Sequence, residues 1–213
     1  MNAGAVATVF VVDDDASMLK ALSRRLRLAG WNVQAYASAE AFLDQHDAGL
    51  PGCLLLDVSM PGFDGLELQR RLVDTGSARP IVFLTGQAEA PVIVRAMRAG
   101  ALNLLTKPVH DEDLLLAVAE AIDKDREWRH AQADLIPLRQ RLQTLTPREA
   151  DVFRGVIVGR LNKQIAGDMG IAEKTVKIHR GRVMEKMGVR SVAELVLLAD
   201  RLGIVPYQPR GAG

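Results

Sequence analysis

The sequence has 213 residues, enough for one large domain or two of roughly 100 residues each, and its 48% hydrophobic and 25% charged content excludes broad disorder. No apolar run approaches the roughly 20 residues of a membrane span and the first residues lack the basic stretch of a signal peptide, so we expect a cytoplasmic protein without a membrane partner. The net charge of +1 divides unevenly: residues 1–144 carry 15 Lys and Arg against 19 Asp and Glu, and residues 145–213 carry 12 against 7, which indicates two modules, the second suited to nucleic acid.

Short apolar runs alternate with helical patterns over the first 125 residues. Apolar runs separated by helices are typical of parallel sheets covered on both faces. Ser38 can cap a helix, and Gly30 and Gly100 end two helical patterns. We expect strands at 9–12, 31–36, 53–56, 81–84 and 102–105, with helices over 18–26, 38–43, 66–72 and 92–97 and from Asp111 onward. The predicted fold class is α/β, a doubly wound five-stranded parallel sheet.

Cys53, in the third expected strand, is the only cysteine. A single cysteine excludes an intramolecular disulfide and cysteine-clustered zinc or iron–sulfur sites. We expect Cys53 to be buried and inert.

Polar side chains follow four of the five expected strands. They are Asp13, Asp14 and Asp15 after the first, Asp57 after the third, Thr85 at the end of the fourth and Lys107 after the fifth. In an open parallel sheet these ends meet at one edge, where ligands bind. Carboxylates gathered there need a cation, and their oxygens suit Mg²⁺ completed by waters. With the Lys107 ammonium and the Thr85 hydroxyl nearby, a carboxylate would be poised to attack phosphorus, although each residue alone is an ordinary turn former.

A polar stretch over residues 123–144 follows the expected sheet. Apolar residues recur in it at spacings of three and four, the pattern of a helix with one apolar seam. The seam is Trp128, Ala131, Leu135, Leu138, Leu142 and Leu145. Two interpretations stay open: a helical linker that packs on either domain, and a coiled coil that pairs two chains. Pro137 should kink or split this helix.

Residues 145–213 contain only helical patterns. Thr146 and Glu149 have the spacing of a capping box, with Pro147 at the first helical position. We expect helices from Thr146 to between Gly155 and Gly159, over 162–169, over 173–187 and from Ser191 to Leu202. The chain then divides into an α/β domain over 1–125, a helical linker over 126–144 and an all-helical domain over 145–213.

The expected helix over 173–187 has two faces. Val176, Val183 and Met187 fall on one side and should belong to a core. The outer face is Lys174, Lys177, Ile178, Gly181, Arg182 and Glu185. A basic helix with a small residue at its centre can lie in a DNA major groove, and a solvated surface is the alternative.

The strand-end motifs resemble the receiver domain of two-component response regulators over about residues 7–125. The motifs are Val11-Val12-Asp13-Asp14-Asp15, Leu55-Leu56-Asp57-Val58-Ser59-Met60-Pro61-Gly62, Phe83-Leu84-Thr85-Gly86 and Thr106-Lys107-Pro108. The resemblance implies a flavodoxin-like fold and phosphorylation of Asp57 by a histidine kinase or a small phosphodonor. It implies Mg²⁺ held by Asp14, Asp57, the Ser59 carbonyl and, through a water, Asp13. It further implies that Thr85 contacts the phosphoryl group, that Lys107 pairs with it and that the Lys107–Pro108 bond is cis.

Two features depart from the receiver pattern. Leu104 stands where receivers usually carry Tyr or Phe, and residues 86–91 differ from the usual loop. The phosphorylation chemistry should survive both changes, which concern how the signal leaves the domain. An aspartyl-phosphate phosphatase is the alternative of a different class. Such enzymes usually carry a second acid two residues after the nucleophile, where this chain has Ser59, so the sequence disfavours an enzyme.

The helical domain resembles the LuxR-type helix-turn-helix over about residues 145–205. The motifs are Leu145-Thr146-Pro147-Arg148-Glu149, Asn162-Lys163-Gln164-Ile165-Ala166, Thr175-Val176-Lys177-Ile178-His179-Arg180 and Lys186-Met187-Gly188-Val189. The resemblance implies that Lys177 and Ile178 read bases, flanked by Lys174 and Arg182, while Asn162, Lys163 and Thr175 hold the phosphate backbone. Many relatives have Ser at the position of Ala172, so this helix lacks a side-chain cap.

Together the two resemblances imply the NarL/FixJ class of response regulators. The implied function is a transcription factor that binds a double-stranded DNA operator and is switched by phosphorylation of Asp57. Phosphorylation is expected to favour a homodimer through the face built from residues 91–120. DNA binding regulated through protein contact alone, without phosphate, is the remaining alternative.

Overall fold

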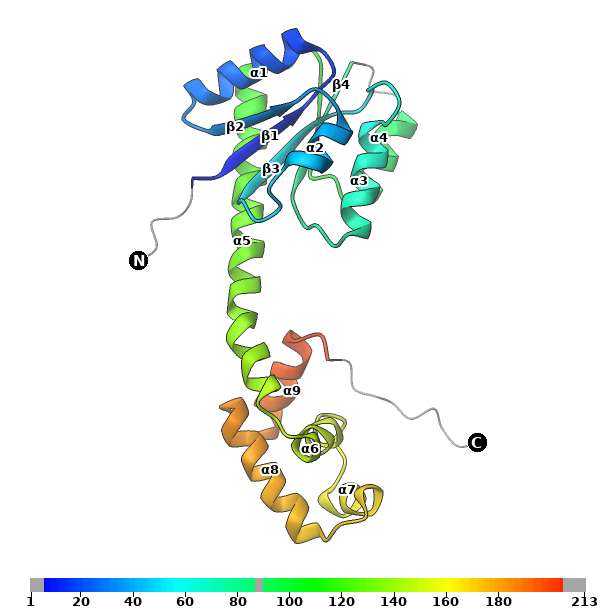
Figure 1. Cartoon of the computed structure of the whole chain (residues 1–213), viewed down its shortest axis with the longest axis vertical. Helices are drawn as coiled ribbons and strands as arrows, with labels where there is room; N and C mark the ends of the chain where they lie inside the picture. Colours follow the sequence, from blue (N-terminus) through cyan, green and yellow to red (C-terminus); the bar gives the residue numbers. More distant parts are fainter. Residues whose placement is uncertain (1–5, 87–89, 205–213) are drawn as a thin grey trace. The chain divides into compact units, whose positions relative to one another are not determined.

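The computed structural model describes residues 6–86 and 90–204, which form two compact units divided between Arg129 and His130 (Figure 1). The first unit is built around a sheet, and the described part of the second contains only helices. The predicted order, an α/β fold followed by an all-helical one, is confirmed.

Five strands of the first unit form a parallel sheet in the order β2-β1-β3-β4-β5. They are β1 (Thr8–Val12), β2 (Asn32–Tyr36), β3 (Gly52–Asp57), β4 (Ile81–Thr85) and β5 (Asn103–Thr106). Each lies within one residue of the apolar run that predicted it. Because the strand order reverses at β1, the loops after β1 and β3 open a crevice at that end of the sheet.

Helices cover both faces of the sheet (Figure 1). They are α1 (Ala16–Leu28) and the start of α5 (Asp111–Gln143) on one face, and α2 (Ala39–Gln45), α3 (Gly65–Asp74) and α4 (Ala90–Arg98) on the other. In β1, Phe10 and Val12 enter the core under α2–α4, and Val9 and Val11 enter the core under α1 and α5. This burial on both faces explains why the strands are continuous apolar runs. Cys53 lies in the core under α1 and α5, where burial raises the pKa of its thiol to about 12. A thiol with so high a pKa stays protonated, which agrees with the expectation that Cys53 is buried and inert.

α5 continues through Pro137, so the expected split of this helix is wrong. A proline inside a helix removes one backbone hydrogen bond and costs about 3 kcal/mol. Leu138 and Leu142 are partly buried against the core of the second unit, and this apolar contact opposes the cost. Leu145 joins them there, so the second half of the apolar seam packs within the chain, as the linker interpretation predicts.

The second unit continues with α6 (Pro147–Ile157), α7 (Asn162–Met169), α8 (Glu173–Met187) and α9 (Val192–Arg201). The predicted capping box opens α6: Glu149 N–H donates to Thr146 Oγ1, and Thr146 N–H donates to the Glu149 carboxylate. Ala172 leaves α8 without a side-chain cap, as expected. Among the described residues no helix is both long and apolar enough to cross a membrane.

Candidate functional site

The carboxyl ends of four strands bring the predicted polar residues to one edge of the sheet. Asp13 follows β1, Asp57 ends β3, Thr85 ends β4 and Lys107 follows β5. Val58 N–H donates to the Leu84 carbonyl at 2.9 Å, and Lys107 N–H donates to the Thr85 carbonyl at 2.7 Å. These bonds extend the sheet ladders past the strand ends and fix the loops that carry the site. The Lys107–Pro108 bond is cis, as expected.

Asp13, Asp14 and Asp57 form a cluster of carboxylates. Their ligand oxygens lie within 4.8 Å of one another, and Asp13 and Asp57 are buried while Asp14 is exposed. Buried carboxylates this close repel one another unless a cation compensates their charge. A set of hard oxygen donors at one edge suits Mg²⁺, which takes one or two carboxylates and keeps several waters. The donor set therefore fits the predicted metal.

Lys107 supplies a cation to this cluster from within the chain. Its Nζ lies 2.7 Å from Asp13 Oδ2 and 2.7 Å from Asp57 Oδ1. Burial raises the pKa of Asp57, opposed by the hydrogen bond from Lys107. Burial lowers the pKa of Lys107, but its hydrogen bonds to Asp13 and Asp57 outweigh this and raise it. Lys107 therefore stays an ammonium beside the Asp57 carboxylate.

Asp15, which the sequence groups with its two neighbours, has a different role. Its carboxylate accepts from Ser17 N–H at 2.8 Å and Met18 N–H at 3.2 Å, which caps α1. The hydrogen bond from Met18, followed by that from Ser17, lowers the pKa of Asp15. Its own N–H donates to Asp13 Oδ1 at 2.9 Å. Asp15 thus starts a helix and orients Asp13.

Ser59 and Thr85 lie at the same edge. Ser59 N–H donates to Asp57 Oδ2 at 3.2 Å, so the loop after β3 folds back on that carboxylate. Thr85 is buried at the end of β4. Leu104, at the position usually aromatic in receivers, packs partly buried against the core under α2–α4. The Ser59 carbonyl as a metal ligand stays a prediction.

Gly65, at the start of α3, is a positioning residue that sequence reasoning missed. A Cβ on Gly65 would lie 2.2 Å from the carbonyl oxygen of Asp57 and 3.2 Å from Leu56 Cγ. Its N–H donates to the Val58 carbonyl at 3.1 Å. Only glycine lets α3 begin this close to Asp57. The Asp64-Gly65 turn was visible in the sequence, but the close approach depends on the tertiary fold.

α8 has the two faces that its sequence predicts. Val176, Val183 and Met187 are fully buried in the core of the second unit. The predicted outer face, Lys174, Lys177, Ile178, Gly181, Arg182 and Glu185, is exposed. The exposed cations of this face are available for a ligand.

The start of α7 is tied to α8 by a contact that the sequence did not reveal. Arg180 Nη1 donates to Asn162 Oδ1 at 3.0 Å. Lys163 is exposed, and Asn162 and Thr175 are partly exposed. The bond from Arg180 orients the Asn162 amide, whose N–H groups can donate to an anionic ligand.

Glu149 joins α6 to α8 through an ion pair in which the carboxylate is buried and Lys186 is partly exposed. Lys186 Nζ lies 2.6 Å from Glu149 Oε2, and the Glu149 side chain is 3% exposed. The hydrogen bond from Lys186, followed by that from the Thr146 N–H, lowers the pKa of Glu149 to about 2. The capping box was predictable, whereas the partner at Lys186 was not, because 37 residues separate the two side chains.

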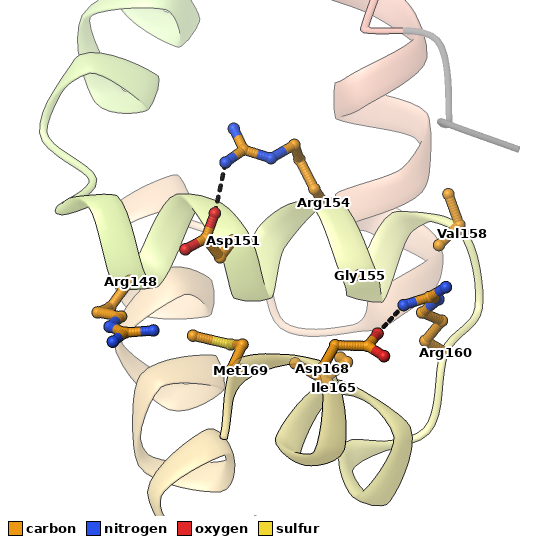
Figure 2. Close-up of a pocket in the computed structure, with 9 residues that line it drawn as sticks. All are labelled: Arg148, Asp151, Arg154, Gly155, Val158, Arg160, Ile165, Asp168 and Met169. Carbon is orange, nitrogen blue, oxygen red and sulfur yellow. Dashed lines mark hydrogen bonds and ion pairs between the residues drawn. The ribbon is translucent and has the colours of Figure 1, made fainter. Parts of the chain in front are cut away.

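A groove of about 620 Å³ lies between α6 and α7 (Figure 2). Arg154 pairs with Asp151 at 2.6 Å, and Arg160 pairs with Asp168. Arg148, Ile165 and Met169 also line it. The groove contains none of the predicted site residues, and its acids are neutralised by its own arginines.

Two families match the chain. Residues 9–119 match the response regulator receiver domain, and residues 143–199 match the bacterial regulatory proteins of the luxR family. Nodulation protein W of Bradyrhizobium diazoefficiens is 44% identical over 203 residues, which cover 95% of this chain and 89% of that protein. The transcriptional regulatory protein FixJ of the same organism is 38% identical over 197 residues, covering 92% and 96% of the two chains.

Solved structures resemble the whole chain as well. The response regulator StyR has a TM-score of 0.73 at 44% identity, covering 92% of this chain and 100% of that one. Full-length FixJ has a TM-score of 0.55 at 39% identity, covering 93% and 98%. The chain thus belongs to the response regulators that join a receiver domain to a LuxR-type DNA-binding domain, and it is a transcription regulator of a two-component system rather than an enzyme.

Proposed function

We propose that Asp57 is the phosphoacceptor of this regulator. The observation that carries the proposal is the position of Lys107 Nζ, 2.7 Å from both Asp57 Oδ1 and Asp13 Oδ2. A fixed ammonium can stabilise negative charge that develops as the Asp57 oxygen bonds to phosphorus and the bond from phosphorus to the kinase histidine breaks. Thr85 is assigned to the phosphoryl oxygens, and Lys107 pairs with them after transfer.

Mg²⁺ is the metal proposed for this site. Asp14, Asp57 and the Ser59 carbonyl are assigned as direct ligands, and Asp13 acts through a metal-bound water. In support, both oxygens of Asp13 already accept hydrogen bonds, from Asp15 N–H and from Lys107 Nζ. When bound, Mg²⁺ supplies positive charge to the phosphoryl oxygens. Asp13 and Asp14 hold the metal and orient its waters.

The remaining assignments concern the division of the chain and its partners. Residues 1–125 form the receiver, residues 126–144 the linker and residues 145–213 the DNA-binding domain. The proposed partners are a cognate histidine kinase, a double-stranded DNA operator and, after phosphorylation, a second copy of the chain. The family membership supports a cytoplasmic location.

The exposed face of α8 is proposed to enter the major groove. Lys177 and Ile178 are assigned to bases, with Lys174 and Arg182 beside them. A long cationic side chain can reach the O6 and N7 atoms of guanine in that groove. The start of α7 is assigned to phosphates through Lys163 and the Asn162 amide, with Thr175 of α8 beside them, because helix N-termini favour anions.

Phosphorylation by acetyl phosphate with Mg²⁺ tests these assignments. Wild-type protein should incorporate one phosphoryl group and bind its operator more tightly in a gel shift. Asp57→Asn should incorporate none, since an amide cannot form the acyl phosphate, and Asp14→Ala should incorporate little because it loses a metal ligand. Normal incorporation in Asp57→Asn contradicts the site. Equal DNA binding with and without phosphate favours regulation by protein contact alone.

A further inference from the structure

A second cavity lies at the edge of the sheet where the strands begin, opposite the end that carries Asp57. Its volume is about 480 Å³, within the range of small-molecule sites. Its lining includes Leu43, Leu72, Ser77, Arg79, Trp128 and Arg129. These residues come from α2, α3, the segment before β4 and α5, so the folded receiver builds the cavity.

Arg79, in the lining of this cavity, has a side-chain nitrogen without a hydrogen-bond partner among the described residues. The residue is only 9% exposed, and its Nη2 makes long contacts of 3.2–3.4 Å with the carbonyls of Asp47, Ala48 and Leu50. Its guanidinium carbon lies 4.1 Å from the centroid of the Phe10 ring. Nη1 is buried and has no hydrogen-bond partner among the described residues. A buried donor on a charged group is costly without an acceptor.

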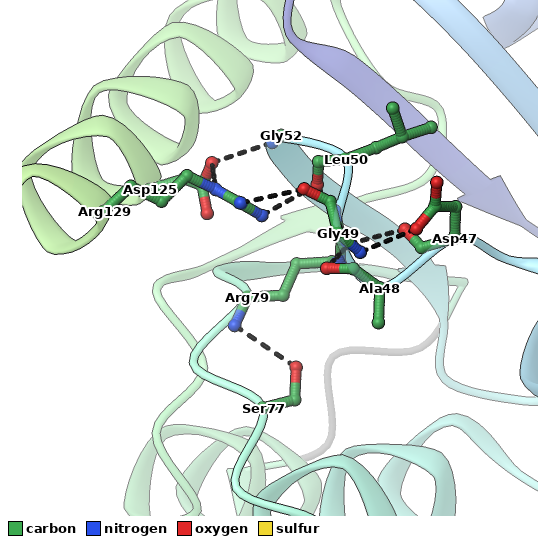
Figure 3. Close-up of polar contacts among 9 residues, drawn as sticks. All are labelled: Asp47, Ala48, Gly49, Leu50, Gly52, Ser77, Arg79, Asp125 and Arg129. Atoms are coloured by element: carbon green, nitrogen blue, oxygen red, sulfur yellow. Dashed lines mark hydrogen bonds and ion pairs between the residues drawn. The ribbon is translucent and has the colours of Figure 1, made fainter. Parts of the chain in front are cut away.

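The neighbouring carboxylate, Asp125, makes no hydrogen bond to Nη1, and its Oδ2 binds other groups (Figure 3). Asp125 Oδ2 accepts from Gly52 N–H at 2.8 Å and from Arg129 Nε at 2.8 Å. Arg129 also donates to the carbonyls of Gly49 and Leu50, at 3.0 and 2.7 Å. The lining therefore carries two guanidinium groups, of Arg79 and Arg129, against the one carboxylate of Asp125, and the Asp47 carboxylate adds a second negative charge near Arg79.

Apolar side chains form another part of the wall, beside the polar residues His46, Thr75 and Ser77. Leu43 and Leu72 are buried or partly buried, and the Trp128 indole on α5 is 41% exposed. A ligand that matches both kinds of wall needs an anionic head and a short apolar body.

We propose that this cavity binds a small carboxylate with an apolar tail, with the carboxylate at Arg79 and the tail against Leu43, Leu72 and Trp128. Carboxylate and guanidinium form strong, charge-assisted hydrogen bonds. Because Asp125, Trp128 and Arg129 belong to consecutive turns of α5, the ligand would strengthen the attachment of this helix to the receiver.

The test titrates the full chain with hexanoate and two controls that each remove one half of the ligand. Trp31→Phe leaves Trp128 as the only tryptophan, so its fluorescence reports the cavity, and calorimetry gives the stoichiometry. Hexanoate should saturate one site, and hexan-1-ol and acetate should bind at least about tenfold more weakly. A dissociation constant for hexanoate above about 10 mM overturns the proposal, as does equal affinity for hexan-1-ol.

Matched substitutions locate the site. Arg79→Lys keeps the charge but removes Nη1, and it should weaken hexanoate binding at least about tenfold. Arg98→Lys, the same change at an exposed arginine of α4 outside the cavity, should leave binding unchanged. If Arg79→Lys fails to fold, calorimetry on Trp128→Ala decides instead, since that side chain is partly exposed and its loss should weaken binding. Wild-type affinity in the folded variant overturns the proposal.

Discussion

Gly65 lies against the backbone carbonyl of Asp57, so the absence of a side chain at Gly65 lets α3 begin close to the proposed phosphoacceptor. In Gly65→Ala the new Cβ would lie 2.2 Å from that oxygen, and the backbone must move. Overpacking of this kind costs about 1–3 kcal/mol. We expect a lower free energy of unfolding and slower phosphorylation, because Asp57 shifts relative to Lys107. Denaturant unfolding and initial rates with acetyl phosphate measure both.

Gly167→Ala is the matched control. Gly167 lies in α7 with no atom within 4 Å of its added Cβ. Removing a helical glycine there should stabilise α7 by roughly 0.5–1 kcal/mol and leave phosphorylation unchanged. If Gly65→Ala behaved in the same way, the close approach of α3 to Asp57 would be irrelevant to the reaction.

Lys177 and Lys163 should make different contributions to DNA binding. Lys177→Ala removes the donor proposed to reach base edges, so it should cost about 1–3 kcal/mol on the best operator and flatten the preference between operators. Lys163→Ala removes a proposed phosphate contact, so it should weaken binding to all sequences alike and reduce the salt slope by roughly one contact. Dissociation constants on a specific and a scrambled duplex at three salt concentrations separate the two. Loss of discrimination in Lys163→Ala alone would contradict the placement of α8 in the groove.

At the scale of elements, the sequence predicted those features that depend on neighbouring residues, namely the strands and the helix caps. The strands were predictable because residues buried on both faces are apolar without interruption, and Ser38, Thr146 and Ser191 cap helices where their sequence neighbours indicate. Pro137 misled, because the local pattern shows the apolar seam with Leu138 and Leu142 but not that their packing on the second unit keeps the helix continuous through the proline. The rule that ligand-binding residues follow the carboxyl ends of parallel strands correctly predicted that Asp13, Asp57 and Lys107 lie together. The same rule says nothing of Gly65 or Arg79, because the close approach at Gly65 and the burial of Arg79 depend on how distant segments pack.

The ion pair between Glu149 and Lys186 should make the attachment of α6 to α8 depend on pH. The pKa of Glu149 falls from 4.5 to about 2 on folding, so the pair contributes stability above pH 4.5 that is lost as pH falls toward 2. Glu149→Gln keeps an acceptor for the Thr146 N–H but removes the charge. The difference in unfolding free energy between wild type and variant should be full at pH 7 and shrink below pH 4.5.

Asp151→Asn is the control for this titration. Asp151 forms an ion pair with Arg154 in which both side chains are exposed, and such pairs contribute about 0–1 kcal/mol. Its effect on unfolding should be small at every pH. A Glu149→Gln difference that stayed constant down to pH 2 would contradict the lowered pKa.

At the scale of the whole molecule, the proposed switch is that phosphorylation changes how two copies of the chain meet, since dimers of helix-turn-helix proteins bind two half-sites. The proposed face, residues 91–120, exposes Val94 and Met97 on α4 and Leu116 on α5, at 46%, 45% and 62%. These side chains lie on the helices before and after the edge strand β5, and exposed apolar surface favours a protein contact. Leu116→Glu should therefore weaken self-association of the phosphorylated protein at least about tenfold without slowing phosphorylation. Leu28→Glu, at a 79% exposed position of α1 outside this face, should do neither. Sedimentation equilibrium before and after complete phosphorylation is the measurement, and a wild-type monomer that stays unchanged rules out this face as the switch.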